Sequence, residues 1–371
     1  MKALLTATVQ SHICQFHRPL ADMLHEHGWE VHVAARNNLA EKNGLQLDFA
    51  DKVFDVPFSR SPKSTDNIKA YKELKCIIES GHYDIIHCNT PMGGIVTRLA
   101  ARKARKSGTK IFYTAHGFHF YKGAPLKNWL VFYPIEKIFS RMTDKLITIT
   151  EEDYALAEKK FFCRTYRMHG VGVDEQRYFA VDKTEKQRIK TEMGFEPNQK
   201  LILCVGELLP NKNQTMAIHM MKEVIKYYPN ARLLLAGNGP EKDNLECEIK
   251  RCGLEDNIRM LGYVTNLQDY QHIADVLVSC SKREGLPLNI VEAMLSGTSV
   301  VASYNRGHRE LICDGETGYL VEVDDIESMA DRVLKLLDDE KNADLIIGNA
   351  KNFAANYGLE SVKEELSNIY E

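Results

Sequence analysis

The chain has 371 residues, of which 44% are hydrophobic and 27% are charged, the proportions of an ordinary globular protein and not of a disordered or membrane-spanning one. Its length exceeds the size at which one hydrophobic core stops growing, so two domains are expected. The nine cysteines include no Cys-x-x-Cys pair, which argues against structural zinc, and their odd number without an export signal predicts a reducing cytoplasm.

The net charge of −3 is unevenly distributed along the chain. Residues 1–180 contain 26 Lys and Arg against 19 Asp and Glu, whereas residues 181–371 contain 22 against 32. A basic half followed by an acidic half indicates that the two halves bind different partners.

Short apolar runs alternate with helical patterns from the first residue onward. In the first half the strands are predicted at 3–9, 31–34, 85–87, 110–114 and 145–149, and the helices at 18–27, 66–80, 93–106 and 151–160. This alternation is typical of parallel βαβ units. Residues 185–200 are charged and poor in apolar side chains, which predicts a linker.

The same alternation starts again after the linker. Strands are predicted at 201–205, 232–236, 258–261, 276–279, 299–302 and 318–321, and helices at 213–227, 240–252, 266–273, 287–296, 307–313, 325–339 and 343–370. The pattern predicts an α/β protein of two doubly wound, Rossmann-like domains with a cleft between them. We expect an N-terminal domain over 1–180, a C-terminal domain over 181–350, and a final helix over 351–371 that can pack back on the N-terminal domain.

Two glutamates flank the strand-to-helix turn after residues 276–279. Glu284 lies on the loop and Glu292 in the following helix, at the sheet edge where open α/β proteins bind ligands. Ionised carboxylates accept several hydrogen bonds, so the pair suits a polyhydroxylated ligand. The alternative is that Glu284 only complements the helix dipole and Glu292 is solvated.

A lysine follows the first strand of the second half in the same way. Gly206 permits close backbone approach at the strand end, and Lys212 precedes the next helix, where it can neutralise a phosphate. A solvated lysine in an ordinary strand–turn–helix is the alternative.

Histidines and an asparagine follow strands in the first half. His116 comes directly after the strand at 110–114, Asn89 after 85–87, and His12 and His17 after 3–9. A lone histidine is more often structural than catalytic, but Gly117 beside it and the strand-end position give a functional role for His116 about equal weight with a structural one.

Several common nucleotide motifs do not occur in the sequence. It contains no Asp-x-Asp, which many nucleotide-sugar enzymes use to hold a metal and diphosphate, and no P-loop. The first strand-to-helix turn has no Gly-x-Gly-x-x-Gly, which argues against a nicotinamide dehydrogenase.

Taken together, these residues resemble the retaining GT-B glycosyltransferases of the family 4 group over nearly the whole chain. The hallmark is Glu-x7-Glu, Glu284 and Glu292 here, followed by Ala-Met-Leu-Ser-Gly at 293–297. The stretch from Ala115 through Tyr121 to Glu136 further resembles transferases of capsule and exopolysaccharide synthesis.

The resemblance implies a role for each site residue. Glu292 would hold the ribose of a nucleotide-sugar, Glu284 its sugar, and Lys212 with the amides of 286–289 its diphosphate, while His116 would approach the sugar from the other domain. It implies no metal and no cofactor, and no protein nucleophile. The implied catalytic residues are His116 and Glu284; the donor-binding residues are Gly206, Lys212, Arg283, Gly285, Leu286, Leu288, Asn289, Glu292 and Tyr263; the acceptor-side residues are His12, His17, Asn89 and His119.

The sequence departs from the family pattern at two places. Glu207 stands where many members carry an arginine that contacts the diphosphate, so either Glu207 points away and Arg283 or Arg309 compensates, or the donor is bound differently in detail. Ser11-His12-Ile13-Cys14 replaces the paired glycines that many members have after the first strand, which puts phosphate contacts of the first domain in doubt.

We therefore expect a cytoplasmic, metal-independent, retaining glycosyltransferase that uses a nucleoside diphosphate sugar, with UDP favoured, and a lipid-linked saccharide acceptor of surface polysaccharide synthesis. No nucleic-acid partner is expected. Basic and aromatic residues at 102–106 and 121–133 are suited to the inner face of a membrane, or else the aromatic residues belong to the core. The alternatives for function are a nucleotide-sugar epimerase of similar architecture and a non-catalytic partner protein.

Overall fold

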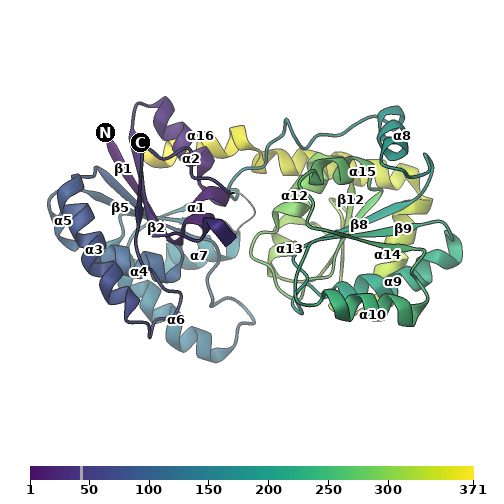
Figure 1. Cartoon of the computed structure of the whole chain (residues 1–371), viewed down its shortest axis with the longest axis horizontal. Helices are drawn as coiled ribbons and strands as arrows, with labels where there is room; N and C mark the ends of the chain where they lie inside the picture. The colour runs from purple at the N-terminus through teal and green to yellow at the C-terminus, as the bar shows by residue number, and fades with distance from the viewer. Residues whose placement is uncertain (42–44) are drawn as a thin grey trace. The chain divides into compact units, whose positions relative to one another are not determined.

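The computed structural model describes residues 1–41 and 45–371. The chain forms two compact units, one of Met1–Gly172 with Leu359–Glu371 and one of Val173–Gly358 (Figure 1). The chain therefore passes from the first unit to the second after Gly172, whereas the sequence predicted this boundary after residue 180. It returns to the first unit at Leu359, whereas the final helix was expected to start at residue 351. No helix in the described part of the chain is both long and apolar enough to cross a membrane.

The first unit is built on a seven-stranded parallel sheet with the order β3-β2-β1-β4-β5-β6-β7. Its strands are β1 (Lys2–Val9), β2 (Glu30–Arg36), β3 (Lys52–Asp55), β4 (Ile85–Asn89), β5 (Lys110–Ala115), β6 (Lys145–Thr148) and β7 (Arg164–Arg167). Every residue of β4 is buried, as expected of a parallel strand covered on both faces. The edge strands β3 and β7 are polar and partly exposed, which explains why a search for apolar runs missed them.

The helices of this unit are α1 (Gln10–Phe16), α2 (Arg18–Glu26), α3 (Asp66–Gly81), α4 (Pro91–Ala100), α5 (Arg102–Lys106), α6 (Leu126–Phe139), α7 (Glu151–Lys160) and α16 (Leu359–Tyr370), with short 3₁₀ turns at η1 (Leu39–Glu41) and η2 (Ser140–Met142). The final helix α16 packs against α2. It is fixed by the Tyr370 hydroxyl, 2.6 Å from His87 Nδ1, and by Glu365, which accepts a hydrogen bond from the His169 amide at 2.9 Å.

The second unit has a six-stranded parallel sheet with the order β10-β9-β8-β11-β12-β13. Its strands are β8 (Leu201–Val205), β9 (Arg232–Ala236), β10 (Ile258–Gly262), β11 (Val276–Ser279), β12 (Ser299–Ser303) and β13 (Tyr319–Val321). The strand order reverses between β8 and β11. At such a switch point the loops leaving the two strands diverge to opposite faces, and the opening between them is where doubly wound sheets bind ligands.

Two helical layers cover this sheet. The helices are α8 (Lys183–Glu192), α9 (Gln214–Tyr227), α10 (Lys242–Cys252), α11 (Leu267–Ile273), α12 (Leu288–Leu295), α13 (Arg306–Leu311), α14 (Ile326–Asp338) and α15 (Glu340–Ala354), with a 3₁₀ turn at η3 (Ala355–Tyr357). One core cluster joins α9, α10 and α14 to the sheet, and a second joins α12 and α15 to it. The fold is thus the predicted pair of Rossmann-like units.

The linker predicted at 185–200 is wrong over residues 185–192, which belong to the helix α8 (Lys183–Glu192). Asp182 caps this helix by accepting a hydrogen bond from the Glu185 amide at 2.8 Å, and Arg188 pairs with Glu185 one turn away. Lys190, only 3% exposed, donates to Asp275 at 3.0 Å. The segment has few apolar residues because charge pairs and one buried lysine, rather than an apolar face, attach it to the unit.

Candidate functional site

The turns after β8 and β9 approach so closely that only glycine fits between them. A Cβ atom on Gly237, whose φ is +149°, would lie 1.9 Å from the Gly206 carbonyl oxygen. The Gly206 amide in turn donates to the Ala236 carbonyl at 2.9 Å. This contact fixes the direction in which the chain leaves β8 and therefore where Lys212 lies.

Lys212 and Glu284 meet at the switch point. Lys212 follows β8, Glu284 follows β11, and the Lys212 Nζ lies 2.6 Å from Glu284 Oε1. The two side chains are 26% and 13% exposed, so the pair is shielded but open to a ligand. An ammonium group has three donors, which leaves Lys212 able to bind an anion while it holds Glu284.

The loop that carries Glu284 is held from two sides. On one side, Asn211 Nδ2 donates to the Arg283 carbonyl at 2.9 Å. On the other, a Cβ on Gly307 would lie 2.6 Å from the Gly285 carbonyl oxygen, so only glycine permits α13 to approach. The Arg283 side chain itself is exposed. The loop backbone is therefore positioned before any ligand binds.

The start of α12 presents backbone rather than side chains. Leu286 and Leu288 pack against the core cluster beneath them, and Asn289 Nδ2 donates to the Val205 carbonyl at 3.2 Å, which ties α12 to β8. No side chain caps the helix at Pro287. The amides of this first turn are thus at the switch point, where the helix dipole favours an anion.

Glu292 lies on α12 in a largely apolar setting. Burial raises its pKa to about 7, against the opposing effects of the Arg177 charge and a hydrogen bond from Tyr178. A carboxyl group whose pKa burial raises to near neutral is typical of a functional site. Tyr178 was not predicted, because nothing in the sequence links it to a helix more than a hundred residues away.

A buried histidine supports this edge of the sheet. His308 on α13 is 0% exposed; its Nε2 lies 2.9 Å from Ser279 Oγ and its Nδ1 lies 2.5 Å from the Ser303 carbonyl oxygen. Burial lowers the pKa of His308 to about 4, so it is neutral. It joins the ends of β11 and β12 to α13.

Two further sequence features of this unit lie at its surface. Tyr263 follows β10, two strands from β8, and is 60% exposed. The Glu207 side chain is exposed, while its carbonyl accepts a hydrogen bond from Gln214 Nε2 at 3.1 Å. The structure therefore brings Gly206, Lys212, Glu284 and the start of α12 together, and leaves the carboxylate of Glu207 in solvent.

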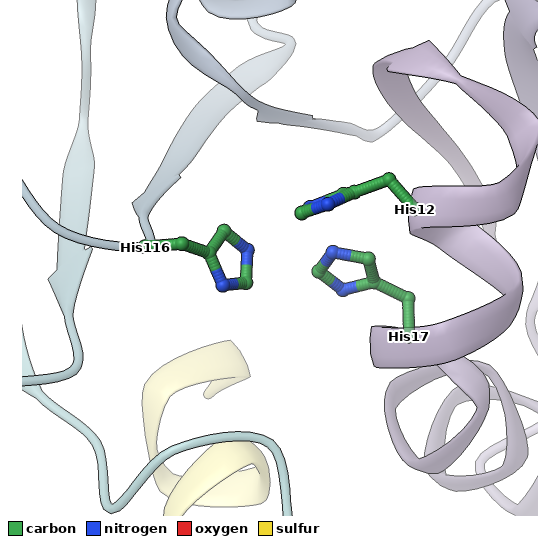
Figure 2. A group of neighbouring side chains, drawn as sticks. All are labelled: His12, His17 and His116. Carbon is green, nitrogen blue, oxygen red and sulfur yellow. The ribbon is translucent and has the colours of Figure 1, made fainter. Parts of the chain in front are cut away.

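In the first unit the structure gathers three of the predicted residues. His12 on α1, His17 between α1 and α2, and His116 after β5 point toward one another (Figure 2). The loop expected at residues 11–14 is instead the helix α1. Asn89 is buried, with its Nδ2 3.3 Å from the Thr6 carbonyl oxygen. His119 is exposed and stacks on Phe132 of α6 with 4.7 Å between ring centroids.

Comparison with known proteins assigns the chain to a family. Residues 3–150 match the family model "Glycosyl transferase 4-like", and residues 185–353 match "Glycosyl transferases group 1". The putative glycosyltransferase EpsD of Bacillus subtilis strain 168 is 38% identical over 371 residues, which cover 100% of this chain and 96% of that protein. The UDP-Gal:alpha-D-GlcNAc-diphosphoundecaprenol alpha-1,3-galactosyltransferase of Escherichia coli is 26% identical over 347 residues, 90% of this chain and 88% of its own.

Solved structures agree in fold. The crystal structure of Anabaena Alr3699/HepE in complex with UDP superposes with a TM-score of 0.80 at 20% identity, covering 100% of this chain and 99% of that one. WaaG, a glycosyltransferase involved in lipopolysaccharide biosynthesis, gives a TM-score of 0.74 at 16% identity over 100% and 99%. The chain therefore belongs to the group 1, 4-like glycosyltransferases and has their GT-B fold.

Proposed function

We propose that the chain transfers a sugar from a UDP-linked donor to a lipid-linked saccharide, with retention of anomeric configuration and without a metal on the diphosphate. The observation that carries this proposal is the pairing of Lys212 with Glu284 at the switch point of the second sheet, 2.6 Å apart. A cation for phosphate and a carboxylate for hydroxyl groups at one point match the two ends of a sugar diphosphate.

The proposed chemistry depends on stabilising the departing diphosphate. As the bond to the sugar breaks, negative charge grows on the phosphate oxygen. Lys212 and the amides at the start of α12 would stabilise it, in the role that a metal has in other transferases. Glu284 would accept hydrogen bonds from the sugar and Glu292 from the ribose. The acceptor hydroxyl would form the new bond to the sugar carbon as the bond to the diphosphate breaks, and the departing phosphate oxygen would take its proton, so no residue need act as base or nucleophile. His116 would contact the sugar.

Relatives support the choice of substrates. The Escherichia coli relative is named for a UDP-galactose donor and a diphosphoundecaprenol-linked acceptor. A Campylobacter jejuni relative, 31% identical over 179 residues, is named for an undecaprenol-diphosphate-linked acceptor as well. Structures of the same fold contain UDP and UDP-glucose. An acceptor of this kind is a membrane lipid, so the enzyme must reach a membrane surface.

The helix α6 offers a surface for that purpose. Leu126, Leu130 and Ile138 recur at spacings of four and eight residues and are 73%, 69% and 57% exposed, so they lie along one side of the helix. Lys127 and Lys137 flank this stripe. The aromatic residues Trp129, Phe132 and Tyr133 instead pack against a core cluster. An apolar stripe with flanking cations is suited to an anionic lipid interface.

Replacing Leu130 with glutamate is expected to weaken binding to anionic vesicles about tenfold or more, because it removes an apolar contact of a few kcal/mol and adds a repelled charge. Sedimentation with phosphatidylglycerol vesicles measures the effect. Leu345→Glu, at a leucine of similar exposure (65%) on α15 of the second unit, is the control and should bind as wild type. Equal binding by wild type and both variants would show that α6 does not contact the membrane.

The function is tested by incubating the purified chain, in EDTA, with UDP-, GDP- and ADP-sugars and a bacterial lipid extract. We expect release of UDP that requires the lipid, and NMR of the product should show the anomeric configuration of the donor. Conversion of the donor without lipid would indicate the epimerase alternative. Absence of turnover with every donor, together with no binding of UDP, would indicate the non-catalytic one.

A further inference from the structure

The three histidines of the first unit place their ring nitrogens around one point (Figure 2). Ring centroids are 4.6 Å apart for His12 and His116, 5.5 Å for His12 and His17, and 5.6 Å for His17 and His116. One ring nitrogen from each residue lies within 4.8 Å of those of the other two. They come from two segments about a hundred residues apart in sequence, so the fold and not local spacing assembles them.

All three imidazoles lack a partner at the same atom. The Nε2 atoms of His12, His17 and His116 are buried and have no hydrogen-bond partner among residues 1–41 and 45–371. A buried polar group left unpaired costs about 1–3 kcal/mol, so three of them together suggest that something binds them. The neighbouring His87 differs, since its Nδ1 lies 2.6 Å from the Tyr370 hydroxyl and its Nε2 lies 2.7 Å from Thr114 Oγ1.

We propose that His12, His17 and His116 form a binding site for a divalent transition metal, with Zn²⁺ as the best match. Three neutral imidazoles and one open position are a common arrangement for this ion. Mg²⁺ and Ca²⁺ prefer oxygen ligands, and no carboxylate belongs to this group of residues.

The charge state of the cluster fits metal binding. Burial lowers the pKa of His12 and His17 well below the usual range, with a smaller contribution from the neighbouring His116, and burial lowers the pKa of His116 to about 4. All three are therefore neutral at pH 7, and a metal need not displace protons from them.

Only a small adjustment is needed to close the site. Two nitrogens bound to one tetrahedral zinc at about 2.0–2.1 Å lie about 3.4 Å apart, so the separations, which reach at most 4.8 Å, must shrink by at most about 1.4 Å. Rotation of the His12 and His116 side chains, which are less buried than His17, can supply this. Those two residues are partly exposed, whereas His17 is 4% exposed.

A metal bound to the three histidines would slow sugar transfer, a consequence that rests on the proposed function. His116 is the residue proposed to contact the sugar, and a bound metal would occupy it. The site would then be inhibitory, separate from the departure of the diphosphate, for which no metal is proposed. Metal binding itself does not depend on that function and is measured without it.

The test titrates Co²⁺ into the full chain, purified without a histidine tag, and follows the visible absorption of tetrahedral cobalt; Zn²⁺ is then added in competition. We expect one tetrahedral site in the first unit that Zn²⁺ displaces and Mg²⁺ does not. His12→Gln and His116→Gln should each weaken its affinity about 100-fold or more, because each removes one of three ligands. Using two positions that are only partly buried guards against a variant that fails to fold.

His219→Gln is the matched control. His219, Glu248 and Cys252 form the other group of possible ligands in the described part of the chain, but the Glu248 carboxylate there is already paired with Arg251. This variant should keep the cobalt band. Absence of a tetrahedral band in wild type, or a band that survives in His12→Gln and His116→Gln, would overturn the proposal whether or not the chain transfers sugar.

Discussion

Replacing Lys212 with alanine is expected to lower kcat/KM for the sugar donor by about 10²–10³-fold, the usual cost of removing one donor that stabilises charge in a transition state. The loss should appear mainly in kcat, because the negative charge on the departing phosphate grows as the bond breaks. Steady-state kinetics with the donor identified by the sugar panel measures both constants.

The structure supplies a control and a caution for this experiment. Lys226→Ala on the following helix α9 removes an exposed lysine that pairs with Glu223, and it should leave kcat/KM unchanged. Lys212→Ala also leaves the shielded Glu284 carboxylate without its partner, so thermal melting must show that the fold persists. Activity within about threefold of wild type in a folded Lys212→Ala would exclude Lys212 from the leaving-group site.

Glu292→Gln is expected to have two effects of opposite sign. At pH 8 it should weaken UDP binding about 10- to 100-fold, because the ribose hydroxyls lose a charged acceptor whose hydrogen bonds contribute about 1.5–3 kcal/mol. It should also stabilise the unliganded protein. The wild-type carboxyl has a pKa of about 7 when folded, against an ordinary value of 4.5.

The sign of the stability change follows from those two values. Between pH 4.5 and 7 the folded carboxyl keeps a proton that the unfolded chain releases, so wild-type stability falls as the pH rises through this window. The full loss, at most about 3 kcal/mol, is present above pH 7. Glutamine does not ionise, so the variant should melt higher than wild type at pH 8 and equally at pH 4.5.

The binding profile gives the matching readout. Wild-type affinity for UDP should rise from pH 6 to 8 as Glu292 ionises, and the rise should be smaller in Glu292→Gln, which shares any titration of UDP itself. Calorimetry at several pH values measures both profiles. Parallel binding profiles would show that Glu292 does not contact the ligand. Equal melting temperatures of the two proteins at pH 8 would show that the pKa of Glu292 is not raised in the folded protein.

The sequence was most informative where the pattern is repetitive. Runs of buried apolar residues predicted the central strands of both sheets, such as β4 and β8, and hence the two Rossmann-like units. The edge strands β3 and β7 and the helix α8 were not predicted. The two strands are polar and partly exposed, and charge pairs attach α8 to its unit, so none of the three has an apolar periodicity in the sequence. Of the two alternatives left open for the aromatic residues at 121–133, Trp129, Phe132 and Tyr133 follow the second, since they pack against a core cluster.

The part of the candidate site that could be predicted follows from the positions of the strand ends. Strand-end positions placed Lys212 and Glu284 at one edge, and the structure shows them in contact. Neither the buried His308 that supports this edge nor the convergence of His12 and His17 on His116 could be read from spacing, because each depends on how separate loops pack. The perturbed pKa of Glu292 likewise arises from burial, which sequence spacing does not reveal.

A calorimetric titration of UDP into the wild-type chain and into Lys212→Ala, both in EDTA, tests the central claim most directly. The account predicts that UDP binds wild type without a metal and that Lys212→Ala binds it at least about tenfold more weakly, because one charge-assisted contact to phosphate is lost. Absence of UDP binding to wild type, a requirement for added Mg²⁺, or equal affinity of the two proteins would contradict it.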